Sequence, residues 1–436
     1  MTALAAARAQ GANDRLRLAL AGCGTRGNYV AGFMNQMPDV EFAGFADPYL
    51  PNAEAARARL NPGGLAVQDF RRLLEVKDID AVVVAAPDHW HAAIAVLAAR
   101  AGKDVYVEKP LAHNIREGQA MVRTAGETGR IMMAGLQHRS APHFAECARM
   151  AAAGELGEVR YVRIWNTINF TPEGIGREAD CAPPPGLDWD LYLGPAPLVP
   201  YNCKRFLATF RWFSDYSGGY ITDFGTHRFD TVHQIMGAAG PVSVNATGAR
   251  YSVQDMGDIP DVLQVTYEYP GFTLSYEGIM MNGFGIPGGG RPRRFYNARG
   301  EYDRPNGMAF YGTKAALFAD RVGYEVYPEI DDGGMWPVQP LPGRPRYRGE
   351  MKVRQSADAT RVHAQRFVHI LRTRELPEDV SVLTGHRATV PPLLGNISYK
   401  TGEKLKWDPA KEELLGASKE AQALLGRVAR RGYGWI

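Results

Sequence analysis

A chain of 436 residues, of which 45% are apolar and 22% charged, has the composition of a globular protein with two or three domains, which excludes a mainly disordered chain. Its formal net charge of +3 gives no electrostatic reason to expect a nucleic-acid partner. No run of about 20 apolar residues is present, so we expect no membrane-spanning helix. The four cysteines lack the spacing of a zinc site or a disulfide framework.

The first 15 residues are predicted to form a tail. Ala7-Arg8-Ala9 reads like the cleavage site of an export signal, but the basic segment and the long apolar segment of such a signal are missing before it. We therefore expect a cytoplasmic protein. A periplasmic protein is the alternative if an export signal has been truncated.

Residues 16–140 alternate between short apolar runs, which predict strands, and periodic segments, which predict helices. Residues 81–86 contain only Val and Ala, which is typical of a central parallel strand buried on both faces. The alternation predicts an α/β domain with a doubly wound parallel sheet, a Rossmann fold. The predicted strands are 16–21, 40–46, 81–86, 104–107 and 131–135, and the predicted helices are a stretch ending near 36, then 53–60, 70–75, 91–101 and 115–128.

The pattern changes beyond this region, and residues 141–436 are predicted to form an α+β domain around a mostly antiparallel sheet. Pro270-Gly271 between two apolar runs predicts a tight turn and hence an antiparallel hairpin. Two segments rich in Gly, Pro and Arg, 283–304 and 340–354, are expected to be long loops. They either face solvent or a second subunit, or cover an anionic or polyhydroxylated substrate. The predicted strands are 159–170, 242–252, 262–269 and 272–281, and the predicted helices are 142–153, 357–372 and 380–401.

A glycine motif, G-x-G-x-x-G, follows the first strand and precedes a helix. In that context glycines permit a tight turn, a close approach of the backbone to a pyrophosphate, and close packing of helix on strand. Asp47 ends the second strand, where a carboxylate can accept hydrogen bonds from an adenosine ribose and would repel a 2′-phosphate. We therefore predict NAD as the cofactor, with NADP less favoured. The motif consists of Gly22, Cys23, Gly24, Thr25, Arg26 and Gly27.

Glu108-Lys109-Pro110 directly follows the predicted strand 104–107. Ligands of doubly wound sheets lie beyond the carboxyl ends of the strands, so Lys109 is expected to point towards the nicotinamide. There its ammonium could polarise a substrate hydroxyl or relay its proton. A surface turn is the alternative interpretation of the tripeptide.

A second group of polar residues lies at helical spacing, with Asp223, His227 and Asp230 at i, i+4 and i+7. A histidine flanked by carboxylates is held in one tautomer and becomes more basic, which suits a general base. A metal site and a buried, hydrogen-bonded histidine are the alternatives, and we predict no metal. Segment 86–91, which contains Pro87 and His91, either lines the cofactor or is a plain strand–helix turn.

Taken together, these motifs resemble the Gfo/Idh/MocA family of NAD(P)-dependent oxidoreductases over nearly the whole chain. The matching residues are the glycine motif, Glu108-Lys109-Pro110, and the G-G-x(3)-D-x(3)-H pattern of residues 218–227. Supporting matches are Pro87 with His91, segment 135–139, and Trp189-Asp190 before segment 193–195.

The resemblance implies an N-terminal Rossmann domain and an open C-terminal sheet that forms the contacts of a homodimer or homotetramer. It implies that Lys109 is the catalytic lysine, that His227 is the acid/base and that Asp223 is the carboxylate beside it. The implied substrates are sugars, sugar derivatives and cyclitols. The predicted cofactor contacts are Gly22, Gly24, Thr25, Arg26, Gly27, Asp47, Pro87, His91, Glu108, Lys109 and Gln137, and the predicted substrate contacts are Lys109, Arg139, Trp165, Trp212, Asp223 and His227.

Three functions remain open from the sequence. The first is an NAD-dependent dehydrogenase, in which Trp165 and Trp212 provide apolar faces against a sugar ring. The second is an NAD-dependent glycoside hydrolase that oxidises C3 transiently, for which Tyr161, Tyr296 or Tyr311 would supply an extra base. The third is a nucleotide-binding scaffold or sensor without turnover.

Overall fold

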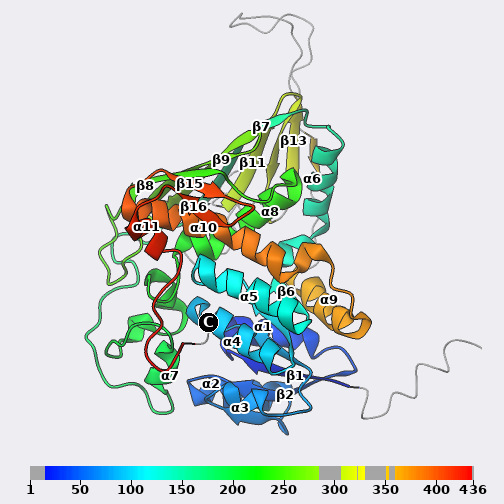
Figure 1. Ribbon diagram of the computed structural model, residues 1–436, viewed down its shortest axis with the longest axis vertical. Coiled ribbons are helices and arrows are strands. Elements are labelled where there is room, and N and C mark those ends of the chain that lie inside the picture. The colour runs from blue at the N-terminus through cyan, green and yellow to red at the C-terminus, as the bar shows by residue number, and fades with distance from the viewer. Residues whose placement is uncertain (1–14, 284–305, 322, 329–349, 353–358, 435–436) are drawn as a thin grey trace, which may run out of the picture.

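The computed structural model describes residues 15–283, 306–321, 323–328, 350–352 and 359–434, which form two sheets with helices between and beside them (Figure 1). The first sheet has six parallel strands in the order β3-β2-β1-β4-β5-β6. All four residues of β4 are buried, as a central strand covered on both faces requires. The strands are β1 (Leu16–Ala21), β2 (Val40–Ala46), β3 (Leu65–Val67), β4 (Ala81–Val84), β5 (Asp104–Glu108) and β6 (Met132–Gly135).

Helices cover both faces of this sheet, which confirms the predicted Rossmann fold. One face packs against α3, α4 and α5, and the other against α1, α2 and α9. Helix α9 comes from late in the chain and lies beside the first sheet (orange in Figure 1). These helices are α1 (Thr25–Met34), α2 (Leu50–Leu60), α3 (Arg71–Leu74), α4 (Asp88–Arg100), α5 (Ile115–Thr128) and α9 (Ala359–Thr373).

The second sheet has ten strands in the order β14-β13-β12-β11-β7-β10-β9-β8-β15-β16. Neighbouring strands in this sheet pair antiparallel, except that β7 and β10 pair parallel. The predicted, mostly antiparallel sheet is therefore confirmed. The predicted hairpin at Pro270-Gly271 joins β9 to β10. The strands are β7 (Val159–Thr167), β8 (Ser243–Ala249), β9 (Val262–Tyr269), β10 (Phe272–Ile279), β11 (Asn306–Gly312), β12 (Ala315–Ala319), β13 (Tyr324–Pro328), β14 (Glu350–Lys352), β15 (Leu405–Asp408) and β16 (Glu413–Leu415).

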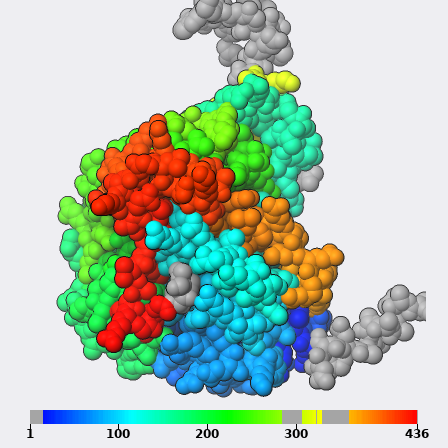
Figure 2. Space-filling model, viewed as in Figure 1, coloured from blue at the N-terminus to red at the C-terminus, as the bar shows by residue number. Residues whose placement is uncertain are grey.

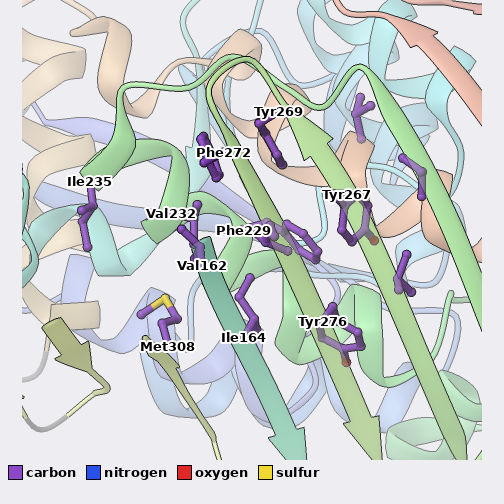
Figure 3. Close-up of a cluster of buried hydrophobic side chains, with 14 of the residues drawn as sticks. Val162, Ile164, Phe229, Val232, Ile235, Tyr267, Tyr269, Phe272, Tyr276 and Met308 are labelled. Carbon is purple, nitrogen blue, oxygen red and sulfur yellow. The ribbon is translucent and has the colours of Figure 1, made fainter. Parts of the chain in front are cut away.

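One face of the second sheet is buried under helices, as Figure 3 shows for α8 against β7, β9, β10 and β11. Side chains alternate along a strand, so Val162 and Ile164 enter this core, whereas Tyr161, Arg163 and Trp165 lie on the opposite face of the sheet. The helices are α6 (Pro142–Ala152), α8 (Thr226–Met236), α10 (Val382–Thr401) and α11 (Lys419–Ala423), and α7 (Trp189–Leu193) lies further along, near α4.

The last described residues, after α11, contact both the first domain and the segment around α7. In Figure 2 the residues after α11 (red) lie against the first domain (cyan) and against the segment around α7 (green). Arg427 forms an ion pair with Glu117 of α5 (2.7 Å), and the Tyr433 hydroxyl donates to the Asp190 carboxylate of α7 (2.7 Å). The division of the chain at residue 140 stays a prediction.

Some elements differ from the prediction. Strand β3 and strands β11–β16 were not predicted, because they are short or lie among turn-forming residues. The expected loop 283–304 lies almost wholly outside the described residues; of the expected loop 340–354, the structure describes only β14, which pairs with β13. None of the helices in the described ranges combines the length and apolar character needed to cross a membrane.

Candidate active site

The glycine motif forms the turn between β1 and α1. Gly22 has a φ of +93°, and a Cβ there would lie 2.4 Å from the backbone nitrogen of Ala86. A Cβ on Gly27 would lie 2.0 Å from the carbonyl oxygen of Gly22, so only glycine lets the helix pack this closely. Gly24 is the N-cap of α1, and no described side chain caps the first turn, which leaves its N–H groups available to an anion.

A large cavity of about 1080 Å³ opens in front of this turn. Asp47 lines it, and both carboxylate oxygens of Asp47 accept backbone hydrogen bonds, from Cys23 and Tyr49 (2.9 Å each). Burial raises the pKa of Asp47 to about 6, although these two hydrogen bonds oppose the rise. Residues of the chain between α7 and α8, including Phe206 and Arg211, line the cavity as well.

This cavity fits a dinucleotide. The glycine turn and the start of α1 would receive its pyrophosphate, and Asp47 would accept from its adenosine ribose. Pro87 and His91 also line the cavity, where the His91 ring lies between the carbonyl oxygens of Ala86 and Pro110 (2.7 and 2.8 Å from its ring nitrogens).

Lys109 follows β5 and reaches across to the second domain. Its ammonium donates to the Asp223 carboxylate (2.6 Å) and to the Asp223 carbonyl oxygen (2.8 Å). The Arg211 guanidinium lies 3.2 Å from the other carboxylate oxygen. Burial disfavours ionisation of Asp223, but the charges of Lys109 and Arg211 outweigh it and hold the pKa of this carboxyl well below its usual range.

A second cavity of about 390 Å³, here called the histidine cavity, adjoins the first, because Arg26 and Lys109 line both. His227 lies in its wall and stacks on His138, with 4.7 Å between ring centroids. Burial, and next the charge of Lys109, lower the pKa of His227 well below its usual value, so the ring is neutral at pH 7. The lining residues are Arg26, Lys109, Gln137, His138, Ala141, His143, Phe144, Phe224, His227, Arg321, Ala359 and Thr360.

The prediction that Asp223 and Asp230 flank His227 is wrong. A π-helical turn, Ile221–Gly225, precedes α8, and Asp223 pairs with Lys109 rather than with His227. Asp230 forms an ion pair with Arg139 (2.7 Å). His227 is therefore surrounded by cations and is less basic than a free histidine, not more basic as the spacing predicted. Both carboxylates are thus paired with cations, and among the described residues no cluster of His, Cys, Asp and Glu is arranged to hold a metal ion.

The structure brings most of the predicted site residues together. Gly22, Gly24, Thr25, Arg26, Asp47, Pro87, His91, Glu108, Lys109, Gln137 and His227 line one or both cavities, and Asp223 contacts Lys109 between them. Glu108 is buried and forms an ion pair with Arg26 (2.8 Å). Gly27 packs under the turn.

Three predicted substrate residues lie elsewhere. Trp165 is on the opposite face of β7 from α8, under the Arg163 guanidinium (5.3 Å). Trp212 packs against Phe170 (5.1 Å), and Arg139 binds Asp230; neither lines a cavity described above.

The tyrosines proposed as an extra base for glycoside hydrolysis are not near His227. Tyr161 and Tyr311 stack on each other (5.5 Å) on the outer face of the second sheet, because their strand positions alternate with those of the core. Tyr296 lies outside the described residues.

The sequence did not single out several residues of the histidine cavity. His138 lies in segment 135–139, which was noted only as a family match. His143 is the second residue of α6 and Phe224 follows Asp223, but neither has a local pattern that reveals its role. Arg321 follows β12, a strand that the sequence did not predict.

Comparison with known families agrees with this geometry. Residues 16–136 match the model of the Gfo/Idh/MocA oxidoreductase family with its NAD-binding Rossmann fold, and residues 167–278 match its C-terminal alpha/beta domain. The chain belongs to the Gfo/Idh/MocA family. The resemblance to this family that the sequence motifs indicated is therefore confirmed. The matched model of the N-terminal domain describes an NAD-binding Rossmann fold.

Among curated relatives, inositol 2-dehydrogenase of Rhizobium meliloti is 28% identical over 246 residues, which are 56% of this chain and 62% of that protein. The scyllo-inositol 2-dehydrogenase (NAD(+)) of Bacillus subtilis is 31% identical over 34% of this chain and 44% of its own length. The matches therefore span less than two thirds of these relatives. A solved structure of a putative NADPH-dependent oxidoreductase from Desulfitobacterium hafniense shares the fold with a TM-score of 0.66 at 17% identity, over 91% of this chain and 99% of the other.

Proposed function

We propose that the protein is an NAD-dependent oxidoreductase that transfers a hydride between the nicotinamide and a secondary hydroxyl of a sugar or cyclitol. The observation that carries this proposal is the meeting of Lys109, Asp223 and His227 where the large cavity adjoins the histidine cavity. The names of the relatives agree, because two are inositol dehydrogenases and a third is a levoglucosan dehydrogenase.

The side chains suit proton handling during oxidation of an alcohol. His227 lies in the wall of the histidine cavity and its ring is neutral, so it can take the hydroxyl proton. The Lys109 ammonium would polarise the hydroxyl oxygen, and Asp223 holds that ammonium in place. The bound nicotinamide supplies the acceptor for the hydride. In the reverse direction His227 returns the proton to the carbonyl oxygen.

The test is to incubate the NAD-loaded protein with a panel of cyclitols, pyranoses and glycosides and to follow absorbance at 340 nm. We expect NADH to form with at least one of them. Lys109→Met should lower turnover by about 10²–10⁴-fold, the range of a lost acid–base or charge contribution, while the dissociation constant of NAD changes little. If NAD binds and no compound reacts, the scaffold interpretation is favoured instead. If a chromogenic glycoside is cleaved without net NADH, the hydrolase is favoured.

We also propose that the outer face of the second sheet is the contact of a homodimer or homotetramer. This face carries the Tyr161–Tyr311 stack, Trp165 and the Arg163–Glu277 ion pair (2.6 Å), an aromatic and polar mixture suited to an interface. Analytical ultracentrifugation tests it; a monomer at micromolar concentration would contradict it. The cytoplasmic location stays a prediction.

A further inference from the structure

The charges in the wall of the histidine cavity are unbalanced. Among the described residues that line it, none is acidic, and three are cationic: Arg26, Lys109 and Arg321. Two of these cations already have carboxylate partners, since Arg26 pairs with Glu108 and Lys109 with Asp223. Arg321 has no carboxylate within ion-pair distance in the described part of the chain, so it brings an uncompensated positive charge to the wall.

Arg321 is held at the cavity by the turn between β12 and β13. The residue before it, Asp320, accepts a hydrogen bond at its carbonyl oxygen from Nε2 of His143 (2.9 Å), which fixes this turn against α6. The Arg321 guanidinium lies over the ring of Phe224 at 5.2 Å. Its charge contributes to lowering the pKa of both His138 and His227, which agrees with its position beside those rings.

The same cavity holds polar atoms that lack partners. Gln137 Oε1, His143 Nδ1 and His227 Nδ1 are buried without a hydrogen-bond partner among the described residues. Because Nε2 of His143 donates to a carbonyl oxygen, Nδ1 of the neutral ring is an acceptor. Leaving such atoms unpaired is unfavourable by about 1–3 kcal/mol each, but they lie beneath the wall of the cavity, so a ligand meets the charges of the wall and not these atoms.

We propose that the substrate of this site is a sugar acid, whose carboxylate binds Arg321 in the wall of the histidine cavity. The proposal rests on the proposed function and narrows its substrate class. A guanidinium presents two parallel N–H groups that match a planar carboxylate. A single uncompensated cation balances one negative charge, which favours a carboxylate over a phosphate dianion.

Calorimetric titration of the NAD-loaded protein tests the proposal. The probes are D-galacturonate and D-gluconate, each compared with its neutral counterpart, D-galactose or D-glucitol, and D-glucose 6-phosphate is added as a phosphate probe. Arg321→Gln removes the charge from an exposed residue, so the fold should persist. Arg123→Gln, at another exposed position, on α5, makes the same change away from the cavity.

We expect at least one sugar acid to bind more tightly than its neutral counterpart. R321Q should weaken that binding by about 2- to 5-fold, the contribution of an ion pair made by an exposed guanidinium, and R123Q should leave it unchanged. Equal binding of the acids and the neutral sugars, acid binding that R321Q leaves unchanged, or a preference for the phosphate would each overturn the proposal.

The outcome is separable from that of the proposed function. If neutral sugars or cyclitols are oxidised as efficiently as the acids, and R321Q changes neither rate, the sugar-acid proposal fails while the oxidoreductase stands. If a sugar acid binds in an Arg321-dependent way but no compound of the panel forms NADH, the binding proposal stands and the oxidoreductase fails.

Discussion

The two cavities at the centre of this molecule are built in different ways. In the large cavity the predicted cofactor contacts depend mainly on backbone: a glycine turn, the start of α1 and the ends of parallel strands, with Asp47 held by two N–H groups. The histidine cavity is a set of side chains from segments scattered between Arg26 and Thr360. A site made of backbone depends on a particular local sequence motif. In a site made of side chains, one substitution can alter one contact and leave the others in place.

The comparison also separates binding from chemistry. The glycine turn and Asp47 in the large cavity would hold the cofactor, whereas Lys109, which lines both cavities, and His227 can also move or stabilise charge. Changes in the two cavities should therefore alter different measured quantities, and the following experiments test that separation, from the largest expected effect to the smallest.

The largest effect is expected from His227→Asn. This change removes the proposed proton acceptor and should lower kcat/KM for the best substrate by about 10²–10⁴-fold, while the dissociation constant of NAD stays within about 2-fold. His233→Asn is the matched control: His233 is buried on the same helix, but its Nε2 lies 2.9 Å from the Tyr269 hydroxyl and it lines neither cavity. H233N should lower stability and leave kcat/KM nearly intact. An H227N protein with more than a tenth of the wild-type kcat/KM would contradict the assignment.

A second effect is expected from pH on stability. Burial lowers the pKa of His89 and His233 from 6.5 to about 3 and that of His363 to about 4, and the pKa values of His138, His143 and His227 are also lowered. Below pH 6.5 the unfolded chain binds these protons and the folded chain does not, so stability falls as pH falls towards these lowered values. Between pH 7 and pH 5 each of His89, His233 and His363, whose folded-state pKa lies near 3 or 4, should contribute a loss of about 2 kcal/mol.

Asp47 should act in the opposite direction over part of this range. Its pKa is raised from 3.8 to about 6, so the folded state binds its proton more strongly, and its contribution to stability is full below pH 3.8 and lost as pH rises through 6. Urea unfolding at pH 7, 6 and 5 measures the sum. Stability that is constant or increasing on acidification would show that the buried histidines are hydrated or charged in the folded protein.

A third, smaller effect is expected from Asp47→Asn. The change removes a charged acceptor for the ribose hydroxyls and should weaken NAD binding by about 10- to 100-fold, with a smaller loss for NADP. In the wild type, NAD affinity should fall as pH falls below about 6, because Asp47 then becomes protonated. Fluorescence titration measures both. Since Asp47 also accepts from Cys23 and Tyr49, the melting temperature without cofactor is the control for a structural defect. Equal affinity of D47N and wild type for NAD would contradict the ribose contact.

The smallest effect is expected from Trp165→Ala. Trp165 lies on the far side of the second sheet from His227, so kcat/KM per active site should change by less than about 2-fold, although subunit association is expected to weaken. A loss of substrate affinity at a protein concentration where the oligomer is intact would show that Trp165 reaches a substrate after all.

The backbone-built part of the site could be predicted from the sequence, and the reasons are local. Gly22–Gly27 and Asp47 follow β1 and β2 directly, and Lys109 follows β5, so their positions at the carboxyl edge of the sheet are set by strand order alone. The Val and Ala run of β4 and the Pro270-Gly271 turn are equally local, and both elements form where expected.

The side-chain environment could not be predicted, because it depends on contacts between distant segments. Helical spacing placed Asp230 beside His227, but Arg139, 91 residues away in the chain, binds Asp230 instead. Trp165 was expected at the substrate because aromatic rings suit sugars, but the pleat of β7 decides which face it occupies. Arg321 depends on β12 and β13, short strands that are recognisable only once they pair.

Complete folding of the nucleotide-binding half depends on helix α9. Phe367, Val368 and Leu371 of this helix share a buried cluster with Leu18, Phe42 and Tyr106, and the Phe367 ring lies 5.5 Å from that of Tyr106. Helices α1 and α2 cover part of this side of the first sheet, and the rest stays exposed until α9 packs there. During synthesis on the ribosome, residues 16–135 emerge well before residues 359–373, so this apolar surface stays exposed to solvent in the meantime. We therefore expect residues 16–135, expressed without α9, to fold less stably than they do in the whole chain. A truncated product that stops before α9 would be a target for chaperones and proteases.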